Sequence, residues 1–543
     1  MTVVGDEPAA AGFIDSASRN RTEDRVAVVV FAGVGVFASG LFLYLGRRVW
    51  FSNDEWDFIT TRRAGNFDDL MRPHFGHWST IPILVYRLLW WTVGLRSYVP
   101  YQVLIVALHL AAAWMIRCVM RRAGVRPWIA TATAAILVLF GRGYQDIVWA
   151  FQITQVGSLV FGLGHLLLVD HDGPLDRRDW IGLAAGAAGM LCSGVAVTMV
   201  IVVGIAALVR RGWRIAAVHT VPLGLLYLLW WYRYARGSYS TEGITPFGLA
   251  RFVAATIVNV VRAVGSFDAT AALLASLLIA GLVLAWRPTG RAHWSRQAAA
   301  PFALLVGAVV YLVITAFGRA GLPGATHRSR YLDLTLAMLL PALGIAADAV
   351  VRRWRTTAVA VFAILLIGIP GNVRVIAAYT HNQQTKTALF RETVFLLPRL
   401  GDSRLVPKST EPLAPFTIGW LLDGAASGRI PAPSSITDVE RAEGRLRLAL
   451  RAIPNHTTSS ETCRPVVHAV RINLGLGESL RIVKDAVVLA PYVGAQSGYL
   501  PLTFGPGVTL LSSLRNVRFR AFATNPHEAP LICAAPAVFR TVR

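Results

Sequence analysis

The most constraining feature of this sequence is a series of apolar runs, many of them near 20 residues long, that alternate with short segments rich in arginine. About 20 apolar residues is the length that an α-helix needs to cross the hydrocarbon core of a bilayer. Of the 543 residues, 55% are hydrophobic and only 15% are charged. Because a soluble fold could not bury that much apolar surface, the sequence predicts a polytopic α-helical membrane protein.

The net charge of +23 does not indicate a nucleic-acid partner. Binding of nucleic acid calls for basic residues concentrated on one face or along one helix. Here they are spread over short segments between apolar runs, which is the pattern of cytoplasmic loops in a membrane protein. We therefore expect membrane lipids, and no nucleic acid, around this chain. The main clusters lie within Arg117–Arg126, Arg210–Arg214, Arg287–Arg296 and Arg352–Arg355.

Keeping these clusters on one side of the membrane predicts about eleven spans between residues 26 and 376. The tail, residues 1–25, is expected in the cytoplasm, followed by an uncleaved signal anchor. Two more apolar segments, Ile81–Leu95 and Phe247–Val264, contain arginine and are predicted to be interfacial helices. The spans are expected near residues 26–46, 99–117, 128–141, 152–169, 215–234, 268–286, 299–317, 331–350 and 357–376, with two short helices in 180–209 that turn at Ser193-Gly194.

The region 377–543 is predicted to be a separate soluble α+β domain, rich in β-structure, on the extracytoplasmic side. Its two cysteines, Cys463 and Cys533, are then expected to form a disulfide, because that side is oxidising. Short alternating runs separated by glycine and proline are typical of a small sandwich. Helices are expected at Lys386–Leu400 and Asp438–Ile453, and strands within Val466–Leu474, Val487–Tyr492 and Val517–Phe522.

Three acids, Asp54, Glu55 and Asp57, follow the first predicted span and fall on its outer side. A carboxylate at the end of a span is costly unless it is hydrated, paired or used in function. They could simply begin a solvated loop or a helix. However, Trp56 and Phe58 would make a poor linker, and acids beside apolar walls have raised pKa values that suit base catalysis. We therefore favour a catalytic role for this segment.

Other predicted outer loops carry further polar candidates. Asp57 and Asp146 are interpreted as acceptor-binding or second acids, and Asp146 could instead simply be the cap of a following helix. Paired arginines suit a phosphate, or else the headgroups of anionic lipids. His74 and His77 are expected to support the first loop, and their spacing leaves open a divalent metal such as Mg²⁺ or Mn²⁺. The candidate phosphate-binding residues are His327, Arg328, Arg330 and Tyr331.

The order of these features resembles the C-type superfamily of membrane glycosyltransferases, which use polyprenyl-phosphate sugars. The resemblance rests on one span, the acidic pair Asp54-Glu55, the segment His77–Pro82, an interfacial helix ending near Gly94, and a further span. It implies that Asp54 is the catalytic base and Glu55 the second acid of the pair. It also implies a carboxylate in the second outer loop and lipid-phosphate-binding basic residues in a late one. Members often have two prolines after the histidine, whereas this chain has only Pro82.

The expected function is inverting transfer of a sugar from a polyprenyl-phosphate donor to an envelope glycan, lipid or protein acceptor, at the outer face of a bacterial plasma membrane. The C-terminal domain would bind the acceptor or its carbohydrate. The sequence has no nucleotide-binding fingerprint, which argues against a nucleotide-sugar donor. A transporter or flippase of lipid-linked sugars and a non-catalytic envelope scaffold are the two alternative classes.

Overall fold

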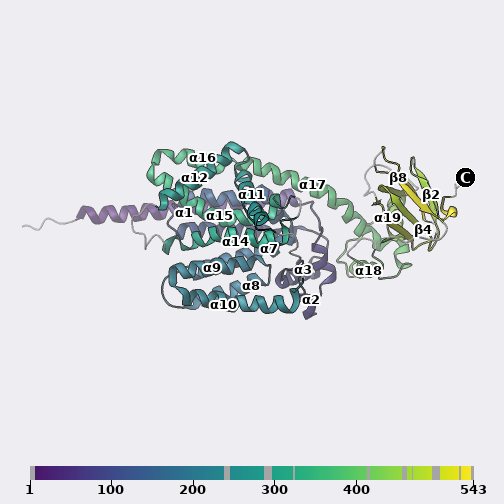
Figure 1. Ribbon diagram of the computed structural model, residues 1–543, viewed down its shortest axis with the longest axis horizontal. Helices are drawn as coiled ribbons and strands as arrows, with labels where there is room; N and C mark the ends of the chain where they lie inside the picture. Colours follow the sequence, from purple (N-terminus) through teal and green to yellow (C-terminus); the bar gives the residue numbers. More distant parts are fainter. Residues whose placement is uncertain are drawn as a thin grey trace, which may run out of the picture. The chain divides into compact units, whose positions relative to one another are not determined.

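The computed structural model describes most of the chain, and Figure 1 shows its elements. The first six residues, the predicted inner loop with Arg287 and Arg291, part of the outer loop before Pro246, and Tyr492 lie outside the described residues. The described ranges are 7–237, 245–286, 296–321, 324–411, 416–454, 461–467, 469–491, 502–515, 517–524 and 527–539.

Within these ranges, nine helical segments are long and apolar enough to cross a membrane, as expected for a multi-pass membrane protein. They are α1 (Glu7–Gly46, from Thr22 onward), α4 (Val99–Arg122), α7 (Ile153–Val169) together with the turn from Ala150 before it, α10 (Trp213–Trp230) with its continuation to Ala235, α11 (Pro246–Gly265), α12 (Asp268–Trp286), α14 (Ala299–Arg319), α15 (Ser329–Arg353) and the pair α16 (Ala358–Leu366) and α17 (Ile369–Leu396).

The remaining predicted spans are shorter helices. Residues 180–209 form two helices that turn at Ser193-Gly194, as the sequence predicts. A helix of 12 residues rises only about 18 Å, which is less than the thickness of a bilayer core. The predicted third span has this length, so it does not cross the core alone. These shorter helices are α5 (Pro127–Val138), α8 (Arg177–Met190) and α9 (Val195–Arg211); the predicted interfacial helix α3 (Thr80–Thr92) is also short.

Helix α11 is long enough to span, but its contacts lie with segments on the predicted outer side. The Asn259 side chain donates to the Thr326 carbonyl at 3.1 Å, just before α15 begins. Asn372, near the start of α17, donates to the Ala263 carbonyl at 3.0 Å, and its own side-chain oxygen accepts from the Arg142 backbone at 3.0 Å. Both the middle and the end of α11 are thus held beside the segments that precede α15 and begin α17, and the interfacial position of α11 stays a prediction.

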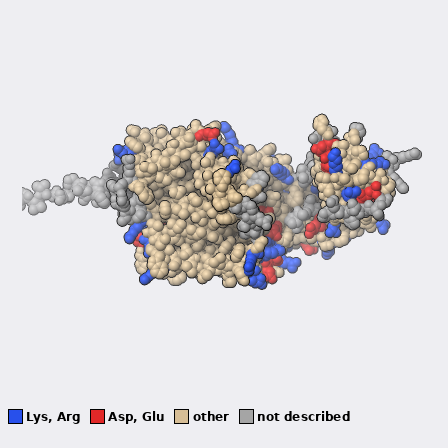
Figure 2. Space-filling view, in the orientation of Figure 1, with Lys and Arg blue, Asp and Glu red and all other residues tan. Residues whose placement is uncertain are grey.

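The arginine-rich helix ends contact one another at one end of the bundle. Asp24 binds Arg117 at 3.3 Å, and Asp348 binds Arg126 at 2.7 Å, which joins α1 to α4 and α15 to the segment before α5. The side of the helical part seen in Figure 2 is almost free of charge between its margins. This division of charged ends and an apolar side is what a bilayer requires.

The chain forms two compact units. The acidic stretch Asp54–Asp57 belongs to the second unit, together with most of the C-terminal region. The first unit comprises residues 1–47, 63–86 and 99–382, and the second comprises residues 48–62, 87–98 and 383–543.

The C-terminal part of the second unit contains two antiparallel sheets and two helices, α18 (Ile418–Ala426) and α19 (Asp438–Ala449). The predicted helix Asp438–Ile453 is too long, because strand β1 begins at Leu450. One sheet has the order β1-β7-β4-β9-β2 and the other β3-β8-β5-β6. The strands are β1 (Leu450–Pro454), β2 (Thr462–Pro465), β3 (Val470–Leu474), β4 (Ser479–Lys484), β5 (Val487–Pro491), β6 (Leu502–Phe504), β7 (Val508–Ser512), β8 (Val517–Ala523) and β9 (Leu531–Ala534).

Each sheet buries one face. Leu480 and Ile482 of β4 and Phe519 and Ala521 of β8 are fully buried, two residues apart in each strand, as the alternation in the sequence predicts. Cys463 and Cys533 face each other across β2 and β9 and form a disulfide. A covalent link across neighbouring strands at a separation of 70 residues limits the freedom of the unfolded domain.

Two glycines provide a test of the bundle packing. A Cβ atom added at Gly281 of α12 would lie 2.4 Å from the Ala346 carbonyl oxygen of α15, whereas one added at Gly40 of α1 would meet nothing within 4 Å. We expect Gly281→Ala to cost about 1 to 3 kcal/mol, because backbone cannot move aside cheaply. Gly40→Ala should be neutral or slightly stabilising. Thermal unfolding of both variants in detergent checks this, and equal melting temperatures would contradict the packing.

Candidate functional site

The acidic stretch is held by a cluster of aromatic rings in the second unit. Trp56 is only 3% exposed. Its ring centroid lies 5.5 Å from Trp50, 5.4 Å from Phe390 and 5.1 Å from Phe416. Ring pairs at such distances add stabilisation beyond the buried area. The segment is therefore fixed to the C-terminal region through Trp56 and is not a loose linker.

The three acids of this segment differ in what they contact. Glu55 is fully buried and accepts hydrogen bonds from the Ser52 backbone at 2.8 Å and the Tyr98 hydroxyl at 2.9 Å. Asp57 accepts from Arg62 Nε at 3.0 Å. Asp54 is half-buried. Glu55 and Asp57 thus shape the loop through these contacts.

In the first unit, His74 and His77 lie on a tight turn. Their backbones exchange two hydrogen bonds of 2.9 Å, and the two residues between them, Phe75 and Gly76, have φ of 45° and 81°. Positive φ at both central positions is the mark of a type I′ turn, which costs little for glycine but strains phenylalanine. Such strain is often found at functional sites, where the surrounding structure imposes it.

Stacked tryptophans anchor this turn to α10. The rings of Trp78 and Trp230 lie 5.1 Å apart with an angle of 3° between their planes, and the Trp230 indole donates to the Met71 carbonyl at 2.9 Å. His77 also packs on the turn between α8 and α9, since a Cβ at Gly194 would lie 2.9 Å from His77 Nδ1. The histidine is therefore held by residues distant in sequence.

A pair of buried carboxylates lies in the same unit. Asp146 is in the short helix α6 (Tyr144–Val148), and Asp333 is near the start of α15; their exposed fractions are 0% and 2%. Gly143 permits the approach, because a Cβ there would lie 2.3 Å from Asp333 Oδ1. Gln145 donates its backbone N–H to Ser329 Oγ at 3.1 Å, which ties α6 to α15. Burial, and then the charge of Asp333, raise the pKa of Asp146 well above its usual range.

Two arginines act on these groups. Arg330 is close enough to Asp146 to oppose part of the rise in its pKa. Burial, and then the charges of Arg319, His74 and Arg330, lower the pKa of His77 to about 4, so this imidazole is neutral at pH 7. His77, Asp146, Asp333, Arg319 and Arg330 are therefore neighbours, since the charges of Arg319 and Arg330 act on His77 and those of Asp333 and Arg330 act on Asp146. We call these five residues the acid–arginine cluster.

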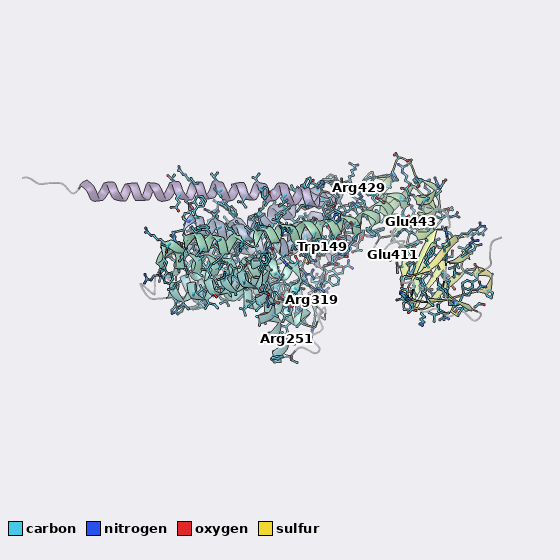
Figure 3. The ribbon with its side chains drawn as sticks, turned by 90° about the horizontal axis from the view of Figure 1, so that it is seen from above. Trp149, Arg251, Arg319, Glu411, Arg429 and Glu443 are labelled. Carbon is cyan, nitrogen blue, oxygen red and sulfur yellow. A yellow bond between two sulfur atoms is a disulfide. The ribbon has the colours of Figure 1, made fainter. Side chains whose placement is uncertain are left out.

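The cluster and its neighbours contain buried polar atoms that have no hydrogen-bond partner among the described residues. Buried polar groups are nearly always paired, so a concentration of unpaired atoms indicates a place for water or a polar ligand. Trp149 and Arg319 lie toward the same end of the helix bundle in Figure 3. The unpaired atoms are both carboxylate oxygens of Asp146, Asp333 Oδ1, His77 Nδ1, Arg330 Nε, Trp149 Nε1 and both side-chain polar atoms of Gln152.

The four predicted phosphate-binding residues differ in how far they are buried. Arg330 is half-buried in the cluster and lies over the Tyr331 ring, with 5.3 Å from its guanidinium carbon to the ring centroid. Tyr331 is buried, while His327 and Arg328 are exposed. Asp333 was not predicted, although an acid within an apolar run is a signal of function in a membrane protein. Its pairing with α6 could not be read from the sequence.

Within the described residues, only one group of three His, Cys, Asp or Glu side chains has the spacing of metal ligands. It consists of His171, Asp176 and Asp179, and includes neither His74 nor His77. Among the described residues, His74 and His77 are therefore not part of a three-residue group that could bind the divalent metal considered for the predicted first outer loop.

Comparisons of this chain with protein-family models, curated proteins and solved structures find no match.

The raised pKa of Asp146 predicts a pH-dependent stability. In the unfolded chain an aspartate titrates near about 3.9, so folding takes up a proton above that pH. The stabilisation is fully present below the pKa that Asp146 has in the unfolded chain. It is lost as pH rises through the pKa that Asp146 has in the folded protein. Asp146→Asn should remove this loss and raise the melting temperature at alkaline pH relative to the unmodified protein. Asp268→Asn, at a side chain that is 86% exposed, is the control. Parallel pH profiles of all three proteins would contradict the raised pKa.

Proposed function

We propose that this protein is an inverting membrane glycosyltransferase that takes a sugar from a polyprenyl-phosphate donor. The observation that carries the proposal is the acid–arginine cluster, where unpaired buried polar atoms gather around two guanidinium groups. Guanidinium is the side chain best suited to phosphate oxygens. The rigidly held acidic segment with a half-buried Asp54 adds a candidate base.

In this mechanism, Asp54 takes the proton of the acceptor hydroxyl. The acceptor oxygen forms a bond to the anomeric carbon, and the bond from that carbon to the phosphate oxygen breaks with its electron pair going to the phosphate. Arg330 and Arg319 bind the phosphate and stabilise the charge that develops on it. Because attack and departure occur on opposite faces of the sugar, the configuration inverts.

Other residues have supporting roles in the proposal. Glu55 fixes the loop through Tyr98 and Ser52. Asp146 binds the acceptor as a neutral acid, since its raised pKa lets it donate a hydrogen bond. The exposed His327 and Arg328 meet the anionic headgroups around the donor. The C-terminal sheets, β1 to β9, bind the envelope glycan, lipid or protein that accepts the sugar, outside a bacterial plasma membrane.

Asp54→Asn should lower the rate of sugar transfer about a hundred- to ten-thousand-fold, which is the usual contribution of a general base. The measurement is transfer of radiolabelled sugar from a polyprenyl-phosphate donor to envelope extract by purified protein. Asp68→Asn, an exposed acid of the following segment, is the matched control and should retain full activity.

Three outcomes of this assay separate the classes of function. Glycosylated product with release of lipid phosphate supports the enzyme. Movement of intact donor across liposome membranes without product would identify a transporter. If neither product nor movement is detected, the scaffold class is the one that remains. A folded Asp54→Asn protein with normal turnover would refute the role of Asp54 as the base.

The two neighbouring arginines should differ in their effects. Arg330→Ala is expected to raise the KM for the donor at least tenfold, because a charge-assisted bond to phosphate is worth about 1.5 to 3 kcal/mol. Arg328→Ala, which removes the same charge from an exposed position, should change the KM less than threefold. Steady-state kinetics with varied donor test this, and equal effects would mean that the cluster does not bind the phosphate.

A further inference from the structure

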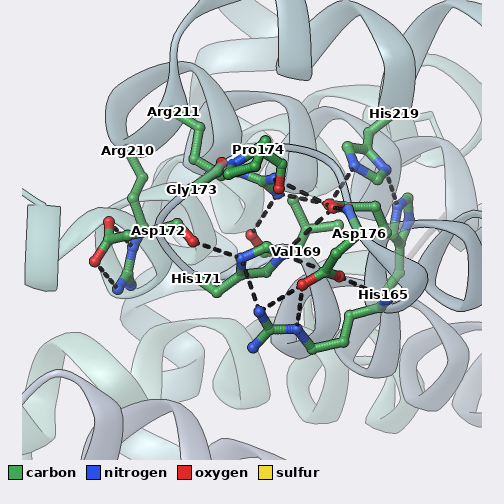
Figure 4. Close-up of polar contacts among 12 residues, drawn as sticks. His165, Val169, His171, Asp172, Gly173, Pro174, Asp176, Arg210, Arg211 and His219 are labelled. Atoms are coloured by element: carbon green, nitrogen blue, oxygen red, sulfur yellow. Dashed lines mark hydrogen bonds and ion pairs between the residues drawn. The ribbon is translucent and has the colours of Figure 1, made fainter.

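A second polar cluster lies at the arginine-rich end of the bundle, where the chain passes from α7 to α8 (Figure 4). Asp170 and Asp172 both bind Arg210, at 2.6 Å and 3.1 Å. Asp179, in the first turn of α8, binds Arg211 at 2.5 Å and His219 at 3.1 Å. These contacts fix the segment 170–176 against the end of α9 and against α10. None of these residues has a role in the proposed transfer reaction.

Within this cluster, His171 is nine-tenths buried, with an exposed fraction of 9%. Its Nδ1 lies 2.9 Å from the Asp172 carbonyl oxygen, which can only accept, so the hydrogen is assigned to Nδ1. Arg178 Nη2 is also 3.3 Å from Nδ1, but it donates to Asp176 Oδ2 at 2.6 Å. Nε2 is therefore the nitrogen with a lone pair.

This nitrogen points at two carboxylates and has no hydrogen-bond partner among the described residues. Nε2 lies 3.4 Å from Asp179 Oδ2 and 3.8 Å from Asp176 Oδ1. Asp176 Oδ1 accepts from the Arg178 backbone N–H at 2.7 Å, and Asp179 Oδ2 accepts from the Asp176 backbone N–H at 2.8 Å and from Arg211 Nη2 at 3.2 Å. His171 Nε2 has no such donor, and its lone pair facing two carboxylate oxygens is unfavourable until a cation lies between them. One possible ligand atom from each of the three residues lies within 4.8 Å of the other two.

We propose that His171 Nε2, Asp176 Oδ1 and Asp179 Oδ2 bind a divalent transition-metal ion. Ligands about 2.1 Å from a tetrahedral Zn²⁺ lie roughly 3.4 Å apart, close to the separations seen here. One imidazole with two carboxylates suits Zn²⁺ or Mn²⁺ better than Ca²⁺. Water completes the coordination.

The surrounding residues match the outer shell of a metal site. The Arg178 side chain binds the other oxygen of Asp176, His219 binds the other oxygen of Asp179, and Arg211 binds both oxygens of Asp179. The backbone carbonyl that accepts from His171 Nδ1 orients the imidazole. Outer-shell bonds of this kind are nearly constant features of metal-binding histidines and carboxylates. In the ion pairs of the cluster, four carboxylates face three guanidinium groups, so one negative charge is in excess before a cation binds.

Zinc binding to the full-length protein in detergent tests the site. After chelator treatment and dialysis against Zn²⁺, mass spectrometry should find one zinc per chain, and Co²⁺ should give the visible absorption of a low-symmetry site. Asp176→Asn should weaken binding at least tenfold while keeping the helix cap, because asparagine caps as well as aspartate. His171→Ala should do the same. Asp172→Asn, a neighbour outside the three ligands, should bind zinc normally.

Several results would overturn the proposal. Absence of stoichiometric zinc from the unmodified protein would refute the metal site. Unchanged zinc content in folded Asp176→Asn and His171→Ala proteins would place the metal elsewhere. The double variant His74→Ala with His77→Ala keeps the site intact and must still bind zinc, which separates this site from the histidines of the first outer loop.

Discussion

The ion pairs between Arg126 and Asp348 and between Arg117 and Asp24 set the position of the helix ends on which the rest of the structure depends. A charged side chain is costly in hydrocarbon, and pairing at the helix end lets α1, α4 and α15 finish together. Once these ends are fixed, the opposite ends must also lie together. The short helix α6 then reaches α15, and the acid–arginine cluster forms from residues that are far apart in the sequence.

Much of the helical architecture could be predicted from the sequence, because apolar runs and arginine clusters report directly on the bilayer. The break at Ser193-Gly194 could be predicted because one helix over residues 180–209 would be longer than the bilayer core is thick, and because a turn there returns Arg210, Arg211 and Arg214 to the inner side. Helix ends were harder, since α17 continues to Leu396 as a polar helix after its apolar run has ended. The first helix likewise begins at Glu7, within the predicted tail. Hydropathy indicates which part of a helix lies in an apolar environment. It does not indicate the residue at which the helical hydrogen bonds end.

The site was predictable only in part, because the role of a side chain depends on partners that local sequence does not reveal. Three acids at positions 54, 55 and 57 look alike in the sequence. The hydroxyl that engages Glu55 comes from Tyr98, and the cation that engages Asp57 comes from Arg62. In the same way Arg328 and Arg330 look equivalent, yet only Arg330 acts on His77 and Asp146. Tertiary contact, not residue type, divides them.

Burial also decides the charge that a ligand meets at the acid–arginine cluster. Two guanidinium groups beside two carboxylates would carry no net charge if both acids were ionised. Desolvation raises the pKa of Asp146 well above its usual range and lowers that of His77 to about 4, so His77 is neutral at pH 7 and burial disfavours the charged form of Asp146. With Asp146 protonated and Asp333 ionised, Arg319 and Arg330 would leave one positive charge in excess. The low-dielectric surroundings that make an isolated acid costly therefore also favour an anion over a cation here, which is the selectivity that a phosphate site needs.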